Sequence, residues 1–127
     1  MEELIVNIKE INNLITNLQD NLGEACLSSA IISFSTGSSI ASYRMDDKSS
    51  ALLSKFTTFM VDMIDKAEVN GQIKYYATKL PGNLMTFTLV FKDYCWFIMV
   101  NTAVVPLGMI MNAVLPECMD DFAIAMA

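Results

Sequence analysis

Apolar residues recur every three or four positions along the first 22 residues, which is the spacing of an amphipathic helix. Polar side chains such as Glu10 and Asn13 occupy the other face. Gly23 follows the last apolar position and can adopt the positive φ angle that often ends a helix. The pattern predicts a helix whose apolar stripe faces the core, formed by Leu4, Ile8, Ile11, Ile15, Leu18 and Leu22.

Two short segments, residues 25–34 and 40–44, favour β-structure and flank the stretch STGSS. Gly37 can supply the positive φ angle of a hairpin loop, and the hydroxyl groups around it can bond to their own backbone. A phosphate-binding loop would need a lysine directly before Ser or Thr, but the next lysine, Lys48, lies eleven residues after Gly37. A nucleophilic serine would need a general base, and the chain has no histidine. The stretch is therefore predicted to be a turn between two strands.

A second helix is predicted over residues 48–69, with Asp46-Asp47 as its N-cap and Asn70-Gly71 at its end. Its apolar positions span an arc of about 140°, which is wider than a single packing stripe requires. The extra width indicates a second contact, while Asp62 and Lys66 mark the solvent face as an i,i+4 pair. The arc consists of Leu52, Leu53, Phe56, Phe59, Met60, Met63, Ile64 and Ala67.

Three further strands are predicted after this helix, at residues 72–80, 84–92 and 94–101. Pro81-Gly82-Asn83 and Lys92-Asp93 separate them, as expected of a β-meander with short turns. The last strand contains CWFIMV, which is apolar at every position. Such a strand is typical of the centre of a sheet that is covered on both faces.

The remaining residues, 105–126, keep helical spacing of apolar positions, with Pro106 suited to the first turn and Pro116 expected to kink or restart the helix. The element order is thus α-β-β-α-β-β-β-α. It predicts an α+β fold of three layers, in which helices cover both faces of a five-stranded, mostly antiparallel sheet. The length of 127 residues suits one domain over residues 1–127.

The composition, 54% hydrophobic and 17% charged, supplies more apolar material than a small core needs. Such an excess indicates a subunit contact, a membrane contact or a ligand cavity. Residues 94–116 carry no charge and are long enough to span a membrane, but Asn101, Pro106 and Gly108 interrupt them and no basic cluster flanks them. A buried strand followed by a buried helix is the preferred interpretation, and detergent-dependent solubility would mark the membrane alternative.

The net charge of −6 argues against a nucleic acid or an anionic membrane as partner. The acidic start of the chain lacks the features of a signal peptide, so a cytoplasmic protein is expected. Cys26, Cys95 and Cys118 are far apart and odd in number, which predicts reduced core residues rather than a disulfide framework.

The absence of histidine removes the commonest general base and most zinc and haem sites. The carboxylate pairs Asp46-Asp47 and Asp120-Asp121 are better explained as a helix cap and a charged helix face than as a metal site. We therefore expect no catalytic, cofactor-binding or metal-binding residues. The ten methionines and Trp96 are expected mainly in the core, although methionines can also line an adaptable groove.

The element order and the stretch Gly37-Ser-Ser-Ile-Ala-Ser42 resemble the Roadblock family, the dynein light chain relatives that include small-GTPase regulators. Here Ser35 and Thr36 stand where the family often has an acid, and Pro116 interrupts a final helix that is usually continuous. The resemblance implies a non-enzymatic dimer in which strands 72–80 join edge to edge and helices 48–69 pack side by side. It also implies a Ras-like or Rag-like GTPase as partner.

The residues themselves favour the same dimer, because the second helix has surplus apolar width and strand 72–80 contains no proline to protect its edge. The expected function is a cytoplasmic homodimeric scaffold or regulator that binds a small GTPase, and a different Roadblock-type chain is an alternative second subunit. The predicted interface consists of Phe59, Met63, Ile73, Lys74, Tyr75, Tyr76 and Thr78.

A ligand-binding sensor of the PAS or GAF type is the alternative function. It would use Trp96, Tyr94 and methionine side chains around a cavity, although no polar cluster to orient a ligand is evident. The profilin-like and longin folds share parts of the same layout and also remain open.

Overall fold

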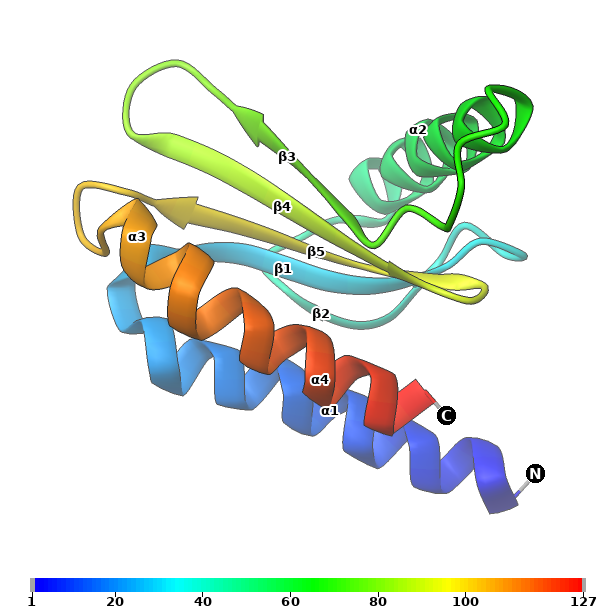
Figure 1. The fold of residues 1–127 in the computed structure, drawn as a ribbon. Helices are drawn as coiled ribbons and strands as arrows, with labels where there is room; N and C mark the ends of the chain where they lie inside the picture. Colours follow the sequence, from blue (N-terminus) through cyan, green and yellow to red (C-terminus); the bar gives the residue numbers. More distant parts are fainter. Residues whose placement is uncertain (1, 127) are drawn as a thin grey trace.

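Five strands form one antiparallel sheet in a computed structural model that describes residues 2–126, with side chains from residue 8 onward (Figure 1). The predicted element order is confirmed. The principal elements are α1 (Glu2–Leu22), β1 (Cys26–Ser33), β2 (Ser39–Tyr43), α2 (Asp47–Lys66), β3 (Tyr75–Lys79), β4 (Leu84–Phe91), β5 (Tyr94–Asn101), α3 (Leu107–Met109) and α4 (Leu115–Met126).

The strands lie in the order β2-β1-β5-β4-β3, and every neighbouring pair is antiparallel. The apolar strand β5 is therefore the central strand, as the sequence predicts. Strand β3 pairs only with β4 and forms one edge of the sheet, while β2 forms the other.

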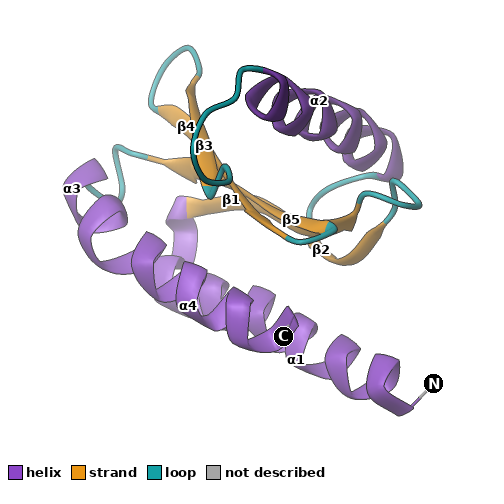
Figure 2. Cartoon of the chain, turned by 45° about the vertical axis from the view of Figure 1, so that its right-hand side comes forward, coloured by secondary structure: helices purple, strands orange, loops and turns teal. Residues whose placement is uncertain are grey.

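Helices cover both faces of the sheet, which confirms the three-layer prediction. Helices α1 and α4 lie side by side on one face, and α2 lies alone on the other (Figure 2). The main core fills the first of these interfaces, where Trp96, Phe122 and Leu18 are almost fully buried. The stripe predicted for α1 supplies Ile11, Ile15 and other buried residues, whereas Leu4 lies outside the residues whose side chains are described.

Glycines at three predicted turns adopt positive φ angles, as the sequence analysis requires. Gly23 has φ +57° immediately after α1, and Gly82 has φ +77° in the turn between β3 and β4. Gly37 has φ +71° in the STGSS turn, and its backbone N–H donates to the carbonyl of Ser33 at 2.8 Å. The stretch is thus a turn between β1 and β2, as predicted.

The final helical region is not a uniform α-helix, because the segment before Pro116 is π-helical. A short helix, α3, runs into a π-helical segment at Ile110–Val114, and α4 follows directly with Pro116 as its second residue. Proline has no N–H and its ring crowds the preceding turn, so the wider π turn can accommodate it without breaking the helical path. The helix therefore continues through Pro116, and the predicted interruption takes the form of a π segment shortly before the proline rather than a restart.

Other predicted details require small corrections. Strand β3 begins at Tyr75 rather than residue 72, and α2 ends at Lys66 rather than residue 69. The chain leaves α2 through Glu68, which has a φ angle of +56°, before it reaches Gly71. All three cysteines are free and buried, which agrees with the prediction of reduced core residues. None of the helices within residues 2–126 is both long and apolar enough to cross a membrane.

The face that α2 turns toward the sheet differs from the expected one. Its fully buried positions are Ser50, Ser54 and Thr57, which are polar and small. The predicted apolar arc is divided, because Leu53 and Ile64 are half-buried whereas Leu52 and Phe56 are exposed. Small side chains let a helix lie close to a sheet, so the larger apolar residues point outward instead.

Candidate functional site

The outer edge of β3 carries backbone groups that have no strand beside them. Lys74 O accepts from Val90 N at 2.9 Å and Leu80 N donates to Leu84 O at 3.0 Å, so even-numbered residues of this segment bond to β4. Because the bonding direction alternates along an antiparallel strand, the N–H and C=O groups of Tyr75, Ala77 and Lys79 point away from the sheet. An edge of this kind is a template for a further strand.

The outward side of α2 is apolar along its length. Phe59 is 61% exposed and Leu52 is 59% exposed, although both are large hydrophobic side chains. Phe56 and Met63 are each 51% exposed. The positions 52, 56, 59 and 63 follow helical spacing, so the four side chains form one continuous stripe, which we call the α2 stripe. Apolar stripes of this size on a helix usually face another protein surface.

Tyr76 connects the α2 stripe to the edge strand. Its ring packs edge-on against Phe56, with 5.8 Å between the ring centroids. Its hydroxyl group lies 2.6 Å from Thr57 Oγ1, in a hydrogen bond between β3 and α2. The free edge and the α2 stripe therefore belong to one surface, and Tyr76 connects them by contacting both Phe56 and Thr57.

The structure brings most of the predicted interface residues to this surface. Phe59 and Met63 are exposed on α2, and Tyr76 and Thr78 lie on β3. Tyr75 is also on β3, but its side chain lines a pocket with residues of α4 on the other face of the sheet. Ile73 and Lys74 precede β3 and line a cavity on the opposite face of the sheet. Ile73 also lines a smaller pocket with Val61 and Ile64 of α2, so it borders that helix without joining the α2 stripe.

Sequence reasoning did not select two residues of the α2 stripe, Leu52 and Phe56, for the interface. The available signal was helical spacing, because Phe56 lies three residues before Phe59 and Leu52 lies four residues before Phe56. It also missed Ala77, whose contribution is its outward-facing backbone rather than its side chain. That contribution depends on which strand pairs with β4 and in which register.

Beneath α2 lies a layer of hydroxyl side chains. Thr57 and Thr88 are fully buried, and Ser54 is nearly so. Thr57 bonds to Tyr76, but Ser50 Oγ and Thr88 Oγ1 have no hydrogen-bond partner among the described residues. Buried hydroxyl groups without partners are costly, so this interface is less stabilising than an apolar one of the same area.

The three cysteine thiols are buried, and burial makes them unreactive. Burial raises the pKa of Cys26 to about 11, an effect that the nearby Arg44 charge partly offsets. Burial likewise raises the pKa of both Cys95 and Cys118 to about 12. A thiol must ionise to act as a nucleophile, so these cysteines are poor ones. Among the described residues, no group of three or more acidic, histidine or cysteine side chains is placed to hold a metal ion.

Trp96 is part of the core rather than of a ligand site. Its ring is 5.6 Å from that of Phe122 between centroids, and its indole N–H donates to Ser29 Oγ at 2.8 Å. Ser29 in turn donates to the carbonyl of Phe97 at 2.8 Å. Several methionines, including Met85 and Met119, pack at the edge of the core and remain partly accessible.

Comparison with known proteins identifies the fold. The sequence matches no protein-family model and no curated protein. The structure matches Myxococcus xanthus MglB with a TM-score of 0.79 at 10% identity, covering 94% of this chain and 89% of the other. It matches a Roadblock/LC7 domain from Streptomyces avermitilis with a TM-score of 0.64 at 13% identity, covering 90% and 89%.

A more distant match is profilin IA from Acanthamoeba castellanii, with a TM-score of 0.53 at 16% identity over 85% of this chain and 94% of the other. At such low identities the likeness establishes the fold alone. The chain has the Roadblock-type, profilin-like fold that the element order and the Gly37–Ser42 stretch predict.

Proposed function

We propose that this chain is a non-catalytic homodimeric scaffold or regulator that uses the joined surface of β3 and α2 for self-association and binds a small Ras-like GTPase. The observation that carries the proposal is the α2 stripe beside a free strand edge. A stripe with half or more of each side chain in water is unfavourable in an isolated protomer. Pairing with a second copy removes it from water and satisfies the backbone groups of β3 together.

A second copy of this chain fits this surface by geometry. Two β3 strands can pair about a two-fold axis, because the outward groups of one strand are the complement of the same groups in another antiparallel strand. The same axis would bring the two α2 helices together on one face of the enlarged sheet. Structural likeness to an MglB with a tetrameric arrangement, at a TM-score of 0.70, also favours self-association.

The GTPase partner rests on the resemblance to the Roadblock family and on the likeness in fold to MglB. Regulation without catalysis by the chain itself agrees with its buried, high-pKa cysteines and with the absence of histidine. A paired dimer would present two neighbouring α2 helices as a broad platform for such a partner. A second Roadblock-type chain in place of the twin copy would offer a similar platform.

A proline at position 77 tests the dimer. Ala77→Pro removes the central outward N–H of β3 and leaves the hydrogen bonds to β4 in place, because Ala77 does not bond to β4. We expect the variant to sediment as a monomer at micromolar concentration with an unchanged circular dichroism spectrum. Ala77→Val, which keeps the N–H group, is the matched control and should remain dimeric. A monomeric wild-type chain would refute the proposed dimer.

The GTPase is tested by affinity purification of the tagged chain from its source cell, with either GDP or a non-hydrolysable GTP analogue present. We expect a Ras-like GTPase to be retained in a nucleotide-dependent manner. Its binding to the purified chain should then be measured by calorimetry with both nucleotides. Retention that is independent of nucleotide, or no GTPase at all, would count against a regulatory role while leaving the dimer unaffected.

A further inference from the structure

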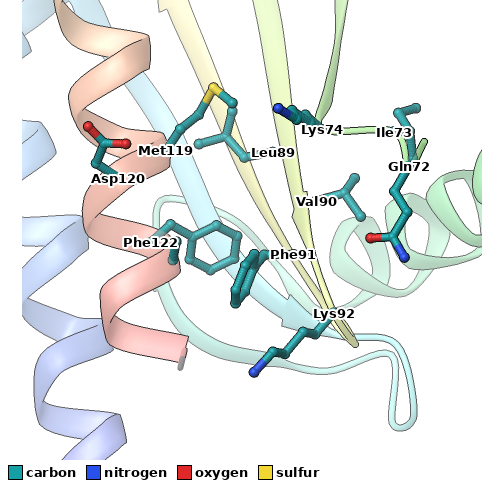
Figure 3. A pocket seen from close by; sticks show the side chains of 11 residues that line it. Gln72, Ile73, Lys74, Leu89, Val90, Phe91, Lys92, Met119, Asp120 and Phe122 are labelled. Carbon is teal, nitrogen blue, oxygen red and sulfur yellow. The ribbon is translucent and has the colours of Figure 1, made fainter. Parts of the chain in front are cut away.

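A second feature lies on the opposite face of the sheet, away from the α2 stripe. A cavity of about 530 Å³ opens between the segment 72–74, the end of β4 and helix α4 (Figure 3). Helices α1 and α4 cover the central strands but leave this corner uncovered. Its volume is within the range of small-molecule sites in proteins, which is roughly 300–1,000 Å³.

The floor of the cavity is apolar and contains two aromatic rings. Phe91 and Phe122 have ring centroids 6.2 Å apart with a tilted geometry, and Leu89 and Met119 lie beside them (Figure 3). Phe91 is only half-buried. A tilted aromatic pair beside an adaptable methionine suits a flat or flexible apolar body.

Three charged residues are among those that line the cavity, Lys74, Lys92 and Asp120. Lys92 Nζ lies 5.3 Å from the centroid of the Phe91 ring, so a positive charge stands directly beside the apolar floor. Lys74 and Asp120 lie toward the other end of the cavity (Figure 3). The chain carries a net charge of −6 with only eight basic residues, yet two of its lysines line this cavity.

We infer that this cavity binds a small anionic amphiphile, a molecule with one carboxylate or sulfonate group and an aliphatic or aromatic body. The body lies on Phe91 and Phe122, and the anionic group pairs with Lys92. The inference does not depend on the proposed GTPase partner, because the cavity is lined by residues 72–74, β4 and α4 and by none of the four residues of the α2 stripe.

Titration of the isotopically labelled full chain with decanoate, kept below its micelle concentration, tests the inference. We expect chemical-shift changes at backbone amides of residues 89–92 and 119–123. Decan-1-ol, which has the same body without the charge, should bind more weakly. Changes located mainly on α2 would overturn the inference, because they would show nonspecific binding to the α2 stripe.

Two variants and a matched control separate the contributions. Lys92→Met keeps the aliphatic stem and removes the charge, and we expect it to raise the Kd for decanoate about three- to tenfold while leaving that for decan-1-ol unchanged. Lys48→Met, on the opposite face of the sheet, should change neither. Ala123→Leu extends into the cavity and should weaken both ligands. Equal affinities in the Lys92 and Lys48 variants would refute the proposed role of Lys92.

Discussion

The two faces of the sheet are stabilised in different ways. Under α1 and α4, nineteen buried residues form one continuous apolar cluster that includes Trp96 and Phe122. Under α2, the corresponding cluster of the described residues has three buried members, Ala30, Ile32 and Cys95, and Phe34, Met45 and Leu53 pack against it only partly buried. The side chains of α2 that are buried there carry hydroxyl groups. The first face therefore resembles the core of an independent domain, and the second does not.

This difference indicates which face of the sheet contributes most to the stability of a protomer. Apolar burial is the main favourable contribution to folding, so the α1/α4 face contributes most of the stability of a single protomer. Helix α2 directs its largest apolar side chains away from the sheet instead. A helix with this orientation contributes little to the core of its own chain and has its apolar area free for another.

The largest expected change in stability comes from a substitution in the core under α1 and α4. Phe122→Ala removes a ring that is 1% exposed and contacts Trp96, so it leaves a cavity in the main cluster. We expect the free energy of unfolding to fall by about 3–5 kcal/mol, measured by urea denaturation at fixed protein concentration.

The matched aromatic control lies on the other face. Phe59→Ala removes the same kind of ring from a position that is 61% exposed. Under conditions where the chain is monomeric it should change the unfolding free energy by less than about 0.5 kcal/mol. If the two substitutions were equally costly in the monomer, the proposed division between the faces would be wrong.

A charge within the α2 stripe should have the next largest effect, on association rather than folding. Phe59→Asp would place a carboxylate where the twin helix is proposed to pack. We expect the dissociation constant of the dimer, measured by sedimentation equilibrium, to rise at least tenfold, which corresponds to about 1.4 kcal/mol.

The control for this charge is Ile124→Asp on α4, a residue that is 73% exposed and belongs to the other face. It introduces the same charge and removes a similar apolar side chain. The dimer should be unaffected by it. Similar dissociation of both variants would point to a general effect of added negative charge on an already acidic chain.

Periodicity in the sequence predicts the elements well, because each has a local cause. The i,i+3/i+4 stripe of α1, the glycine turns and the wholly apolar β5 all depend on near neighbours along the chain. The same holds for the irregularity of the final helix near Pro116. The π-helical segment before it could not be predicted, since its register depends on how α4 packs against α1.

The orientation of α2 could not be predicted from the periodicity of its apolar residues. An apolar arc is assigned to the core by default, but an arc that serves another chain has the same periodicity. The distinguishing sign was the small polar set Ser50, Ser54 and Thr57 on one side of the helix, which fits close to a sheet. The cavity near Lys92 depends on the contact between Phe91 and Phe122, which are far apart in the sequence, and no local pattern reveals it.

The hydroxyl layer beneath α2 yields a pair of substitutions with opposite signs. Thr57→Val removes a hydroxyl that bonds to Tyr76 at 2.6 Å, so it should lower the unfolding free energy by about 1–2 kcal/mol. Thr88→Val removes a buried hydroxyl that has no partner among the described residues, so it should be neutral or stabilising by up to about 1 kcal/mol. Thermal and urea unfolding of both variants would test this. Two changes of the same sign would show that a water molecule or rearrangement satisfies Thr88.

The smallest expected effect concerns pH and the start of α2. Asp46 caps this helix by accepting from Ser49 N at 2.6 Å, and that hydrogen bond lowers the pKa of the carboxyl group. A lowered pKa in the folded state means that the cap stabilises above the unfolded pKa of about 4 and that its contribution is lost as pH falls through the lowered value.

Asp46→Asn keeps an acceptor that does not titrate. The difference in melting temperature between the two proteins should be constant above pH 5 and should shift in favour of the variant below pH 4. Because all other carboxyl groups titrate in both proteins, a difference that stays constant down to pH 2.5 would show that Asp46 does not carry the cap.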